Sequence, residues 1–181
     1  NLIQNKALEL SLFLSIPASI ALLIASDEII SALFGYGKFS EDSVSNSAKA
    51  LYFFSLGLPA FAMIKVFSNF FFANHNTKTP FYISVVSVLL NILISVYFFK
   101  TVGFIIIPIA TSISSWINVL MYCYYIKKKN LHTFDSKFIY KLPRIILSVV
   151  VMGLVLYLLL SVFADKFHYN ESWKFIYLFI I

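Results

Sequence analysis

The chain has 181 residues, of which 60% are hydrophobic and 12% charged, and its net charge is +6. Soluble domains are about 45–50% apolar and about 25% charged, so this composition argues against a water-soluble enzyme and indicates a protein whose main solvent is lipid. The positive charge does not indicate a nucleic-acid partner, because six of the 14 Lys and Arg residues lie between Lys127 and Arg144, beside hydrophobic segments. Such a cluster is typical of a cytoplasmic loop at an anionic leaflet.

The first predicted membrane span covers residues 8 to 26, and Asp27 and Glu28 mark its exit into water. Residues 29 to 34 are short and apolar, which predicts an interfacial turn of helix that ends at the glycines of residues 35 to 37.

The second predicted span starts with Ser40 as its N-cap, because the acidic residues Glu41 and Asp42 would occupy the first turn. It continues to residue 73, which is longer than a bilayer requires. Pro59 should bend this helix, since it has no N–H to donate to the preceding turn.

The third and fourth predicted spans form a hairpin. Thr79 is the expected N-cap of the third span, Pro80 its first helical residue and Phe99 its approximate end. A turn at residues 100 to 103 then leads into the fourth span, residues 104 to 126. Such a short link requires the two helices to be antiparallel neighbours.

The last predicted spans cover residues 145 to 164 and a sixth segment that starts at Trp173. The nine residues of the sixth segment would rise only ~14 Å as a helix, whereas a bilayer core needs ~30 Å. The prediction is therefore an all-α, polytopic transmembrane helical bundle with five complete spans and a truncated sixth. We interpret the chain as an internal or C-terminal part of a longer protein.

The orientation follows from the distribution of basic residues. With the loop after the fourth span in the cytoplasm, five basic residues lie outside and eight lie inside, namely Lys6, Lys78, Lys127, Lys128, Lys129, Lys137, Lys141 and Arg144. The excess predicts that the first span runs from inside to outside.

Polar side chains inside the spans are the candidate functional residues. Lys65 lies in the second span, where a charged residue should face protein or water, or else snorkel to the interface. Asn91 and Asn118 belong to polar stripes on the third and fourth spans. Helix packing explains such stripes as readily as a cavity does, and both interpretations stay open.

Sequence signals for an enzyme or a cofactor are absent. The three histidines fall in separate loops, Cys123 is the single cysteine, and neither a metal-ligand spacing nor a phosphate-binding glycine motif occurs. We expect a non-enzymatic protein without a metal or cofactor.

Five segments together resemble the C-terminal lobe of the MurJ (MviN) lipid II flippases, within a larger superfamily of multidrug, oligosaccharidyl-lipid and polysaccharide exporters. In order they are LFGYGKF (33–39), LGLPAF (56–61), IKV (64–66), NTKTP (76–80) and ATSISSWIN (110–118). The resemblance extends over nearly the whole chain and implies that its spans match the ninth to fourteenth helices of that family.

The resemblance implies a multi-pass protein of the bacterial cytoplasmic (inner) membrane that flips lipid II by alternating access, with cargo of the undecaprenyl diphosphate type and membrane lipids around it. Residues 1–130 would be the four-helix part of the C-terminal lobe, with Lys65, Asn91 and Asn118 lining the cavity. Residues 131–181 would add a cytoplasmic loop and two helices that form a groove for the lipid tail. The N-terminal lobe, which has most of the family's diphosphate-binding arginines, is missing here.

Two rival functions stay open at this point. One is another exporter of the same superfamily, for a polysaccharide-linked lipid or a drug. The other is a non-transporting membrane scaffold for cell-wall synthesis. Restored growth after depletion of the host flippase would exclude the scaffold.

Overall fold

The computed structural model describes residues 2–128 and 136–163, and every element in these ranges is helical. The elements are α1 (Leu2–Ile24), α2 (Ser26–Phe34), α3 (Glu41–Ala73), α4 (Lys78–Val102), the 3₁₀ turn η1 (Gly103–Ile105), α5 (Ile106–Lys128) and α6 (Ser136–Phe163). The predicted sixth span lies outside the described residues.

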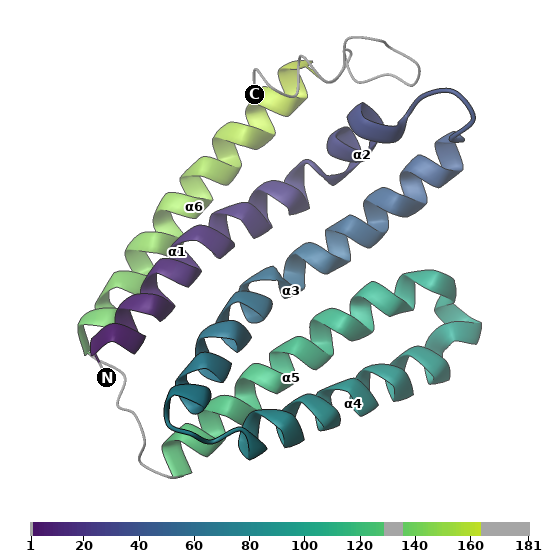
Figure 1. Cartoon of the computed structure of the whole chain (residues 1–181). Coiled ribbons are helices and arrows are strands. Elements are labelled where there is room, and N and C mark those ends of the chain that lie inside the picture. The colour runs from purple at the N-terminus through teal and green to yellow at the C-terminus, as the bar shows by residue number, and fades with distance from the viewer. Residues whose placement is uncertain (1, 129–135, 164–181) are drawn as a thin grey trace.

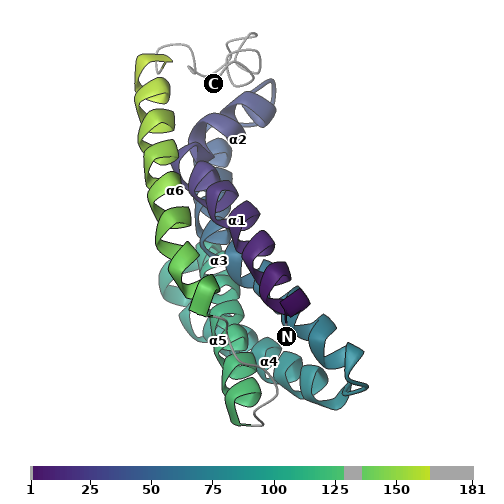
Figure 2. The same cartoon turned by 90° about the vertical axis from the view of Figure 1, so that its left-hand side faces the viewer.

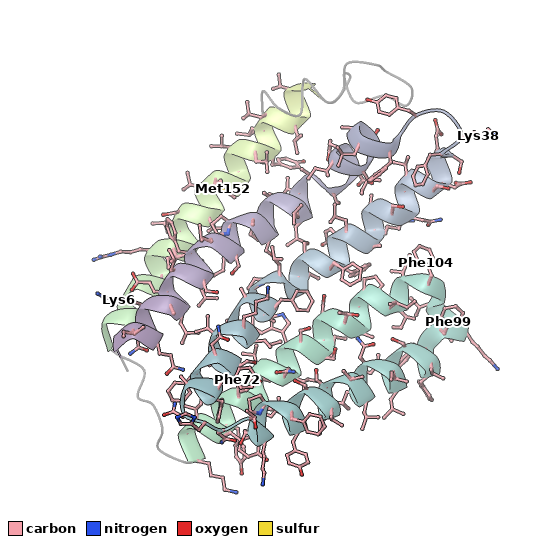
Figure 3. The ribbon with its side chains drawn as sticks, in the orientation of Figure 1. Lys6, Lys38, Phe72, Phe99, Phe104 and Met152 are labelled. Atoms are coloured by element: carbon pink, nitrogen blue, oxygen red, sulfur yellow. The ribbon has the colours of Figure 1, made fainter. Side chains whose placement is uncertain are left out.

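The helices pack side by side (Figure 1). α3 runs between α1 and α5, α4 packs along α5, and α6 packs along α1. Figure 2, a view at 90°, shows the same pairing of α6 with α1. Lys6 and Phe72 lie at one end of the bundle, and Lys38, Phe99 and Phe104 at the other (Figure 3). Lys6, predicted to lie on the cytoplasmic side, and Lys38, predicted to lie on the outer side, are therefore at opposite ends of the bundle.

Within the described ranges, four segments are long and apolar enough to cross a membrane: Ile3–Ile24, Glu41–Ala73, Lys78–Lys128 and Pro143–Val162. The third segment has 51 residues and contains α4, η1 and α5. The chain reverses at Gly103, whose φ of 74° suits glycine, so the predicted antiparallel hairpin is confirmed.

The first helix differs from the prediction at both ends. α1 begins at Leu2 rather than residue 8, because Gln4 and Asn5 are buried against the bundle instead of lying in water. It ends at Ile24, and α2 then starts at Ser26, with the acidic residues predicted to mark the exit in its first turn.

The second helix is confirmed from end to end. Ser40 is the N-cap of α3, and its hydroxyl oxygen accepts a hydrogen bond from the Ser43 N–H at 3.2 Å. The helix continues without a break through Pro59 to Ala73. Figure 1 shows it bending near its middle, as a missing N–H predicts.

The predicted start of the third helix is wrong. α4 begins at Lys78, so Thr79 and Pro80 lie inside its first turn. Thr77 is the N-cap residue but makes no side-chain cap hydrogen bond. Asn76 supplies it instead: its side-chain oxygen accepts from the Thr79 N–H at 3.1 Å, and its amide donates to the Thr79 hydroxyl at 2.9 Å. Proline fits there because first-turn N–H groups have no helical partner.

The later helix ends also move. α4 extends to Val102, so η1 replaces the start of the predicted fourth span, and α5 ends at Lys128. α6 begins at Ser136 instead of residue 145, so part of the predicted cytoplasmic loop is helical.

The described core lies between α1, α3, α4 and α5. Tyr122 is fully buried, with ring centroids 5.7 Å from Phe67 and 5.6 Å from Phe71. Around these rings pack the other buried apolar side chains: Leu8, Leu12, Ala60, Ile83, Val119 and Ile126. This aromatic contact fixes the rotation of α3 and therefore the face on which Lys65 lies.

Candidate functional site: a polar groove between α1 and α3

Lys65 lies on α3, eight residues before the helix ends at Ala73. At 1.5 Å per residue, it lies roughly 12 Å inside that end. Its side chain is exposed and lines a cavity of about 460 Å³ between α1 and α3. The cation therefore opens into a cavity between helices and is not packed in the core.

The opposite wall of this cavity has hydroxyl groups from α1. Ser11 and Ser15 line it, one helical turn apart. Ser15 is only 8% exposed, and its hydroxyl has no hydrogen-bond partner among the described residues. A polar group without a partner costs several kcal/mol in hydrocarbon, so this hydroxyl requires water or a bound polar group.

A second cavity of about 370 Å³ continues along the same two helices. Val66 lines both cavities, and the second adds Gln4 from α1 and Asn69 from α3. Gln4 is buried, yet neither polar atom of its amide has a partner among the described residues. The two cavities together are called the α1–α3 groove below. It joins one cation to a few amide and hydroxyl groups on walls that are otherwise apolar, so it offers an anionic group one charge and an amphipathic surrounding.

A third cavity, of about 560 Å³, lies between α3 and α4. Ser68 and Phe72 line it from α3, one and two turns beyond Lys65, and Lys78 and Tyr82 line it from α4. The Ser68 hydroxyl is hydrogen-bonded to the Tyr122 hydroxyl at 2.8 Å. α3 thus has polar cavities on both sides of Lys65.

Asn91 joins the two helices of the hairpin. Its side-chain amide donates to the Thr111 hydroxyl at 3.0 Å and to the Ser114 hydroxyl at 3.3 Å. Nearby, the Ser87 hydroxyl donates to the Ser114 carbonyl at 2.9 Å. Asn91 is half-buried and does not line the cavity that contains Lys65.

Asn118 is buried on α5, with 5% of its surface exposed. Its side-chain oxygen has no hydrogen-bond partner among the described residues. It does not line the cavity of Lys65 either. The three predicted site residues therefore do not meet in one described cavity.

Sequence reasoning missed Gln4, whereas it placed Asn69 one helical turn after Lys65. Gln4 was placed outside the first span, so its burial was not expected. Asn69 follows Lys65 by four residues, a spacing that places both on one helix face, and it lines the second cavity. In the described ranges, no group of three or more His, Cys, Asp or Glu residues could hold a metal ion.

Comparisons with known proteins agree on one family. Residues 1–178 match the family model described as "Lipid II flippase MurJ". A "Probable lipid II flippase MurJ" of Rickettsia prowazekii is 37% identical over 131 residues, which cover 72% of this chain and 26% of that protein. A "Lipid II flippase MurJ" of Thermosipho africanus is 33% identical over 176 residues, covering 97% of this chain and 34% of that protein.

A solved structure matches as well. It is titled "Lipid II flippase MurJ, inward closed conformation", has a TM-score of 0.80 and 32% identity, and covers 99% of this chain and 36% of its own. The chain thus spans about a third or less of the length of these relatives. With its apolar helices, the match identifies a multi-pass bacterial membrane protein.

Proposed function

The chain belongs to the MurJ family of lipid II flippases, and we propose that it is the C-terminal part of a transporter that moves lipid-linked peptidoglycan precursor across the cytoplasmic membrane. The single observation that supports this most strongly is the fold match, which covers 99% of the chain with a TM-score of 0.80. We further propose five complete spans plus a sixth, with α1 running from inside to outside. An N-terminal lobe would complete the transport path.

The physical problem of this function is the head group. A lipid diphosphate bears at least two charges, and burying isolated charges in hydrocarbon is prohibitive. A polar cavity that opens alternately to the two sides replaces the lost hydration. The α1–α3 groove provides a cation and several unsatisfied polar groups.

We assign Lys65 to the electrostatic attraction of the anionic head group. The hydroxyls of Ser11 and Ser15 would accompany it as neutral donors that tolerate a moving ligand. Asn91 and Asn118 are proposed to line the path in the complete protein, supported by the half-burial of Asn91 and the unpartnered oxygen of Asn118.

The lipid tail requires an apolar surface. On α6 such a surface follows helical spacing and is well exposed: Leu147, Val151, Leu154, Leu158 and Val162. We propose that this face of α6, with the helix that follows, forms the tail groove.

The test uses the full-length protein in a bacterium whose own flippase can be depleted. We expect the wild type to restore growth and to expose lipid II at the outer face, and Lys65→Gln to lose most of this activity. Lys65→Arg should retain more, because it preserves the charge. Lys49→Gln is the matched control, since Lys49 is an exposed lysine nearer the other end of the same helix.

Two outcomes would refute different parts of the proposal. Failure of the wild type to restore growth, with normal membrane insertion, would refute the flippase function and favour another exporter or a scaffold. Full activity of Lys65→Gln would leave the function intact and refute the role of Lys65.

A further inference from the structure

A separate cavity opens between the start of α1 and the early part of α6. Its volume is about 710 Å³, larger than the three cavities described above. α1 contributes Lys6, Glu9, Leu10 and Phe13, and α6 contributes Arg144 and Ile145. It is not part of the α1–α3 groove, with which it shares no lining residue.

The lining is amphipathic. Lys6 and Arg144 are exposed cations from two different helices. Leu10 and Phe13 follow Lys6 on one face of α1, and they are 60% and 54% exposed. A pair of cations thus lies beside exposed apolar side chains that extend roughly 10 Å along the helix.

The position of the cavity matches a membrane interface. Lys6 lies near the start of α1, and Arg144 is the last charged residue of α6 before a run without charges that continues to the end of that helix. Both cations belong to the end of the bundle that has the excess of Lys and Arg. In the orientation proposed above, this end faces the anionic cytoplasmic leaflet.

We propose that this cavity binds an anionic glycerophospholipid of the cytoplasmic leaflet. The phosphate would lie between Lys6 and Arg144, where arginine offers paired donors and lysine a point charge. One acyl chain would lie along Leu10 and Phe13. Basic pockets between membrane helices on the cytoplasmic side bind anionic head groups for this reason.

The charge of the cavity selects one class of lipid. Glu9 lines the same cavity, so the charged residues of its described lining, two cations and one carboxylate, sum to a formal charge of +1. A single phosphodiester has one negative charge, which this formal charge neutralises. The diphosphate of a transport substrate has more negative charge than the cavity would neutralise. The occupant is therefore a bilayer phospholipid rather than the cargo.

Such a lipid would join α6 to α1. Ile145 is buried at the start of the α6 face that packs on α1, and Val149 and Gly153 continue that face in steps of four. Gly153 lies close to Ile20 and Ile24 of α1, so the two helices are in tight contact further along. The lipid phosphate would bridge the same pair of helices at the cytoplasmic end.

The experiment measures lipid binding to the purified full-length protein in a neutral detergent by native mass spectrometry. Phosphatidylglycerol and phosphatidylcholine with identical acyl chains are titrated in parallel. We expect the wild type to prefer phosphatidylglycerol by about tenfold or more, and each of Lys6→Gln and Arg144→Gln to reduce this preference roughly fivefold. Lys127→Gln with Lys128→Gln is the matched control, because it removes two exposed cations from the same end of the bundle.

Further variants and competitors distinguish the possible phosphate-containing ligands and the possible causes of reduced binding. Arg144→Lys should give an intermediate preference, and Glu9→Gln should increase binding of phosphatidylglycerol. An equal loss in the Lys127 and Lys128 control would reduce the effect to general surface charge and overturn the proposal. Full competition by glycerol phosphate would identify a simple anion site, and stronger competition by undecaprenyl diphosphate would identify a cargo site; either overturns it. None of these outcomes bears on transport, which is tested separately by growth.

Discussion

α3 approaches α5 closely at Gly57, which makes this position sensitive to a small substitution. A Cβ atom built there would lie 2.8 Å from the Ser112 hydroxyl oxygen and 3.1 Å from the Phe61 ring. That hydroxyl donates a hydrogen bond to the Phe53 carbonyl on α3. Gly57→Ala must therefore displace the hydroxyl and disturb an interhelical hydrogen bond.

The expected cost can be worked from three terms. Overpacking costs about 1–3 kcal/mol. Loss of an interhelical hydrogen bond in a membrane adds about 0.6 kcal/mol on average. The better helix propensity of alanine returns roughly 0.8–1 kcal/mol. We expect Gly57→Ala to destabilise the fold by about 0.6–2.8 kcal/mol.

The measurement is unfolding of the full-length protein in mixed micelles, followed by circular dichroism as the denaturing detergent is increased. Gly153→Ala is the control, because its Cβ would meet only the Ile20 Cγ2 and Ile24 Cδ1 methyl groups, at 3.1 and 3.2 Å, and no hydrogen-bonding atom. Its packing cost should be close to its propensity gain, leaving a change of about 0.5 kcal/mol or less.

A double-mutant cycle identifies the cause. Ser112→Ala alone should cost about 0.6 kcal/mol, and combined with Gly57→Ala it should relieve part of the clash, so the double variant is more stable than the sum predicts. Strictly additive effects, or a Gly57→Ala variant as stable as the wild type, would refute the reasoning.

Three other predictions concern single contacts. Burial raises the pKa of the Glu28 carboxyl on α2 above its ordinary value of 4.5, so the folded state binds the proton more tightly than the unfolded state. The free energy of unfolding should therefore fall as the pH rises from 4.5 through the folded-state pKa. Melting temperatures measured across this pH range should show the fall, and Glu28→Gln should flatten it. Tyr122→Phe removes the hydrogen bond to Ser68 but keeps the ring contacts, so it should cost about 0.6–1.7 kcal/mol in micelle unfolding, and Ser68→Ala in the same background should add little. Asn76→Ala removes the cap on the Thr79 N–H and should cost about 0.5–2 kcal/mol, whereas Asn76→Asp should retain most of the stability.

Local signals predicted the helices well where one residue had one role. Ser40 is followed by acidic residues and has no competing cap nearby, so the start of α3 was correct. At the start of α4, both Asn76 and Thr79 can cap, and the choice depends on a side-chain hydrogen bond that the sequence does not specify. Local signals therefore predict the existence of this helix correctly but not the residue at which it begins.

The candidate site divides in the same way. Lys65 was recognisable because a charge inside an apolar span is expensive wherever it points. Its neighbours Ser11 and Ser15 depend on the rotation of α1 against α3, which packing and the hydrogen bond from the Ser19 hydroxyl to the Ser55 carbonyl help to fix. Periodicity shows which residues share a face but not which face meets which helix.

The hydrogen bonds of the α4–α5 hairpin have a consequence for biogenesis. Asn91 donates both of its described side-chain hydrogen bonds to Thr111 and Ser114, across a reversal only a few residues long. The two side-chain N–H donors are therefore satisfied within the hairpin itself, without a contribution from the other described helices. The pair can leave the insertion machinery as one preassembled unit, and its asparagine never has to enter lipid alone.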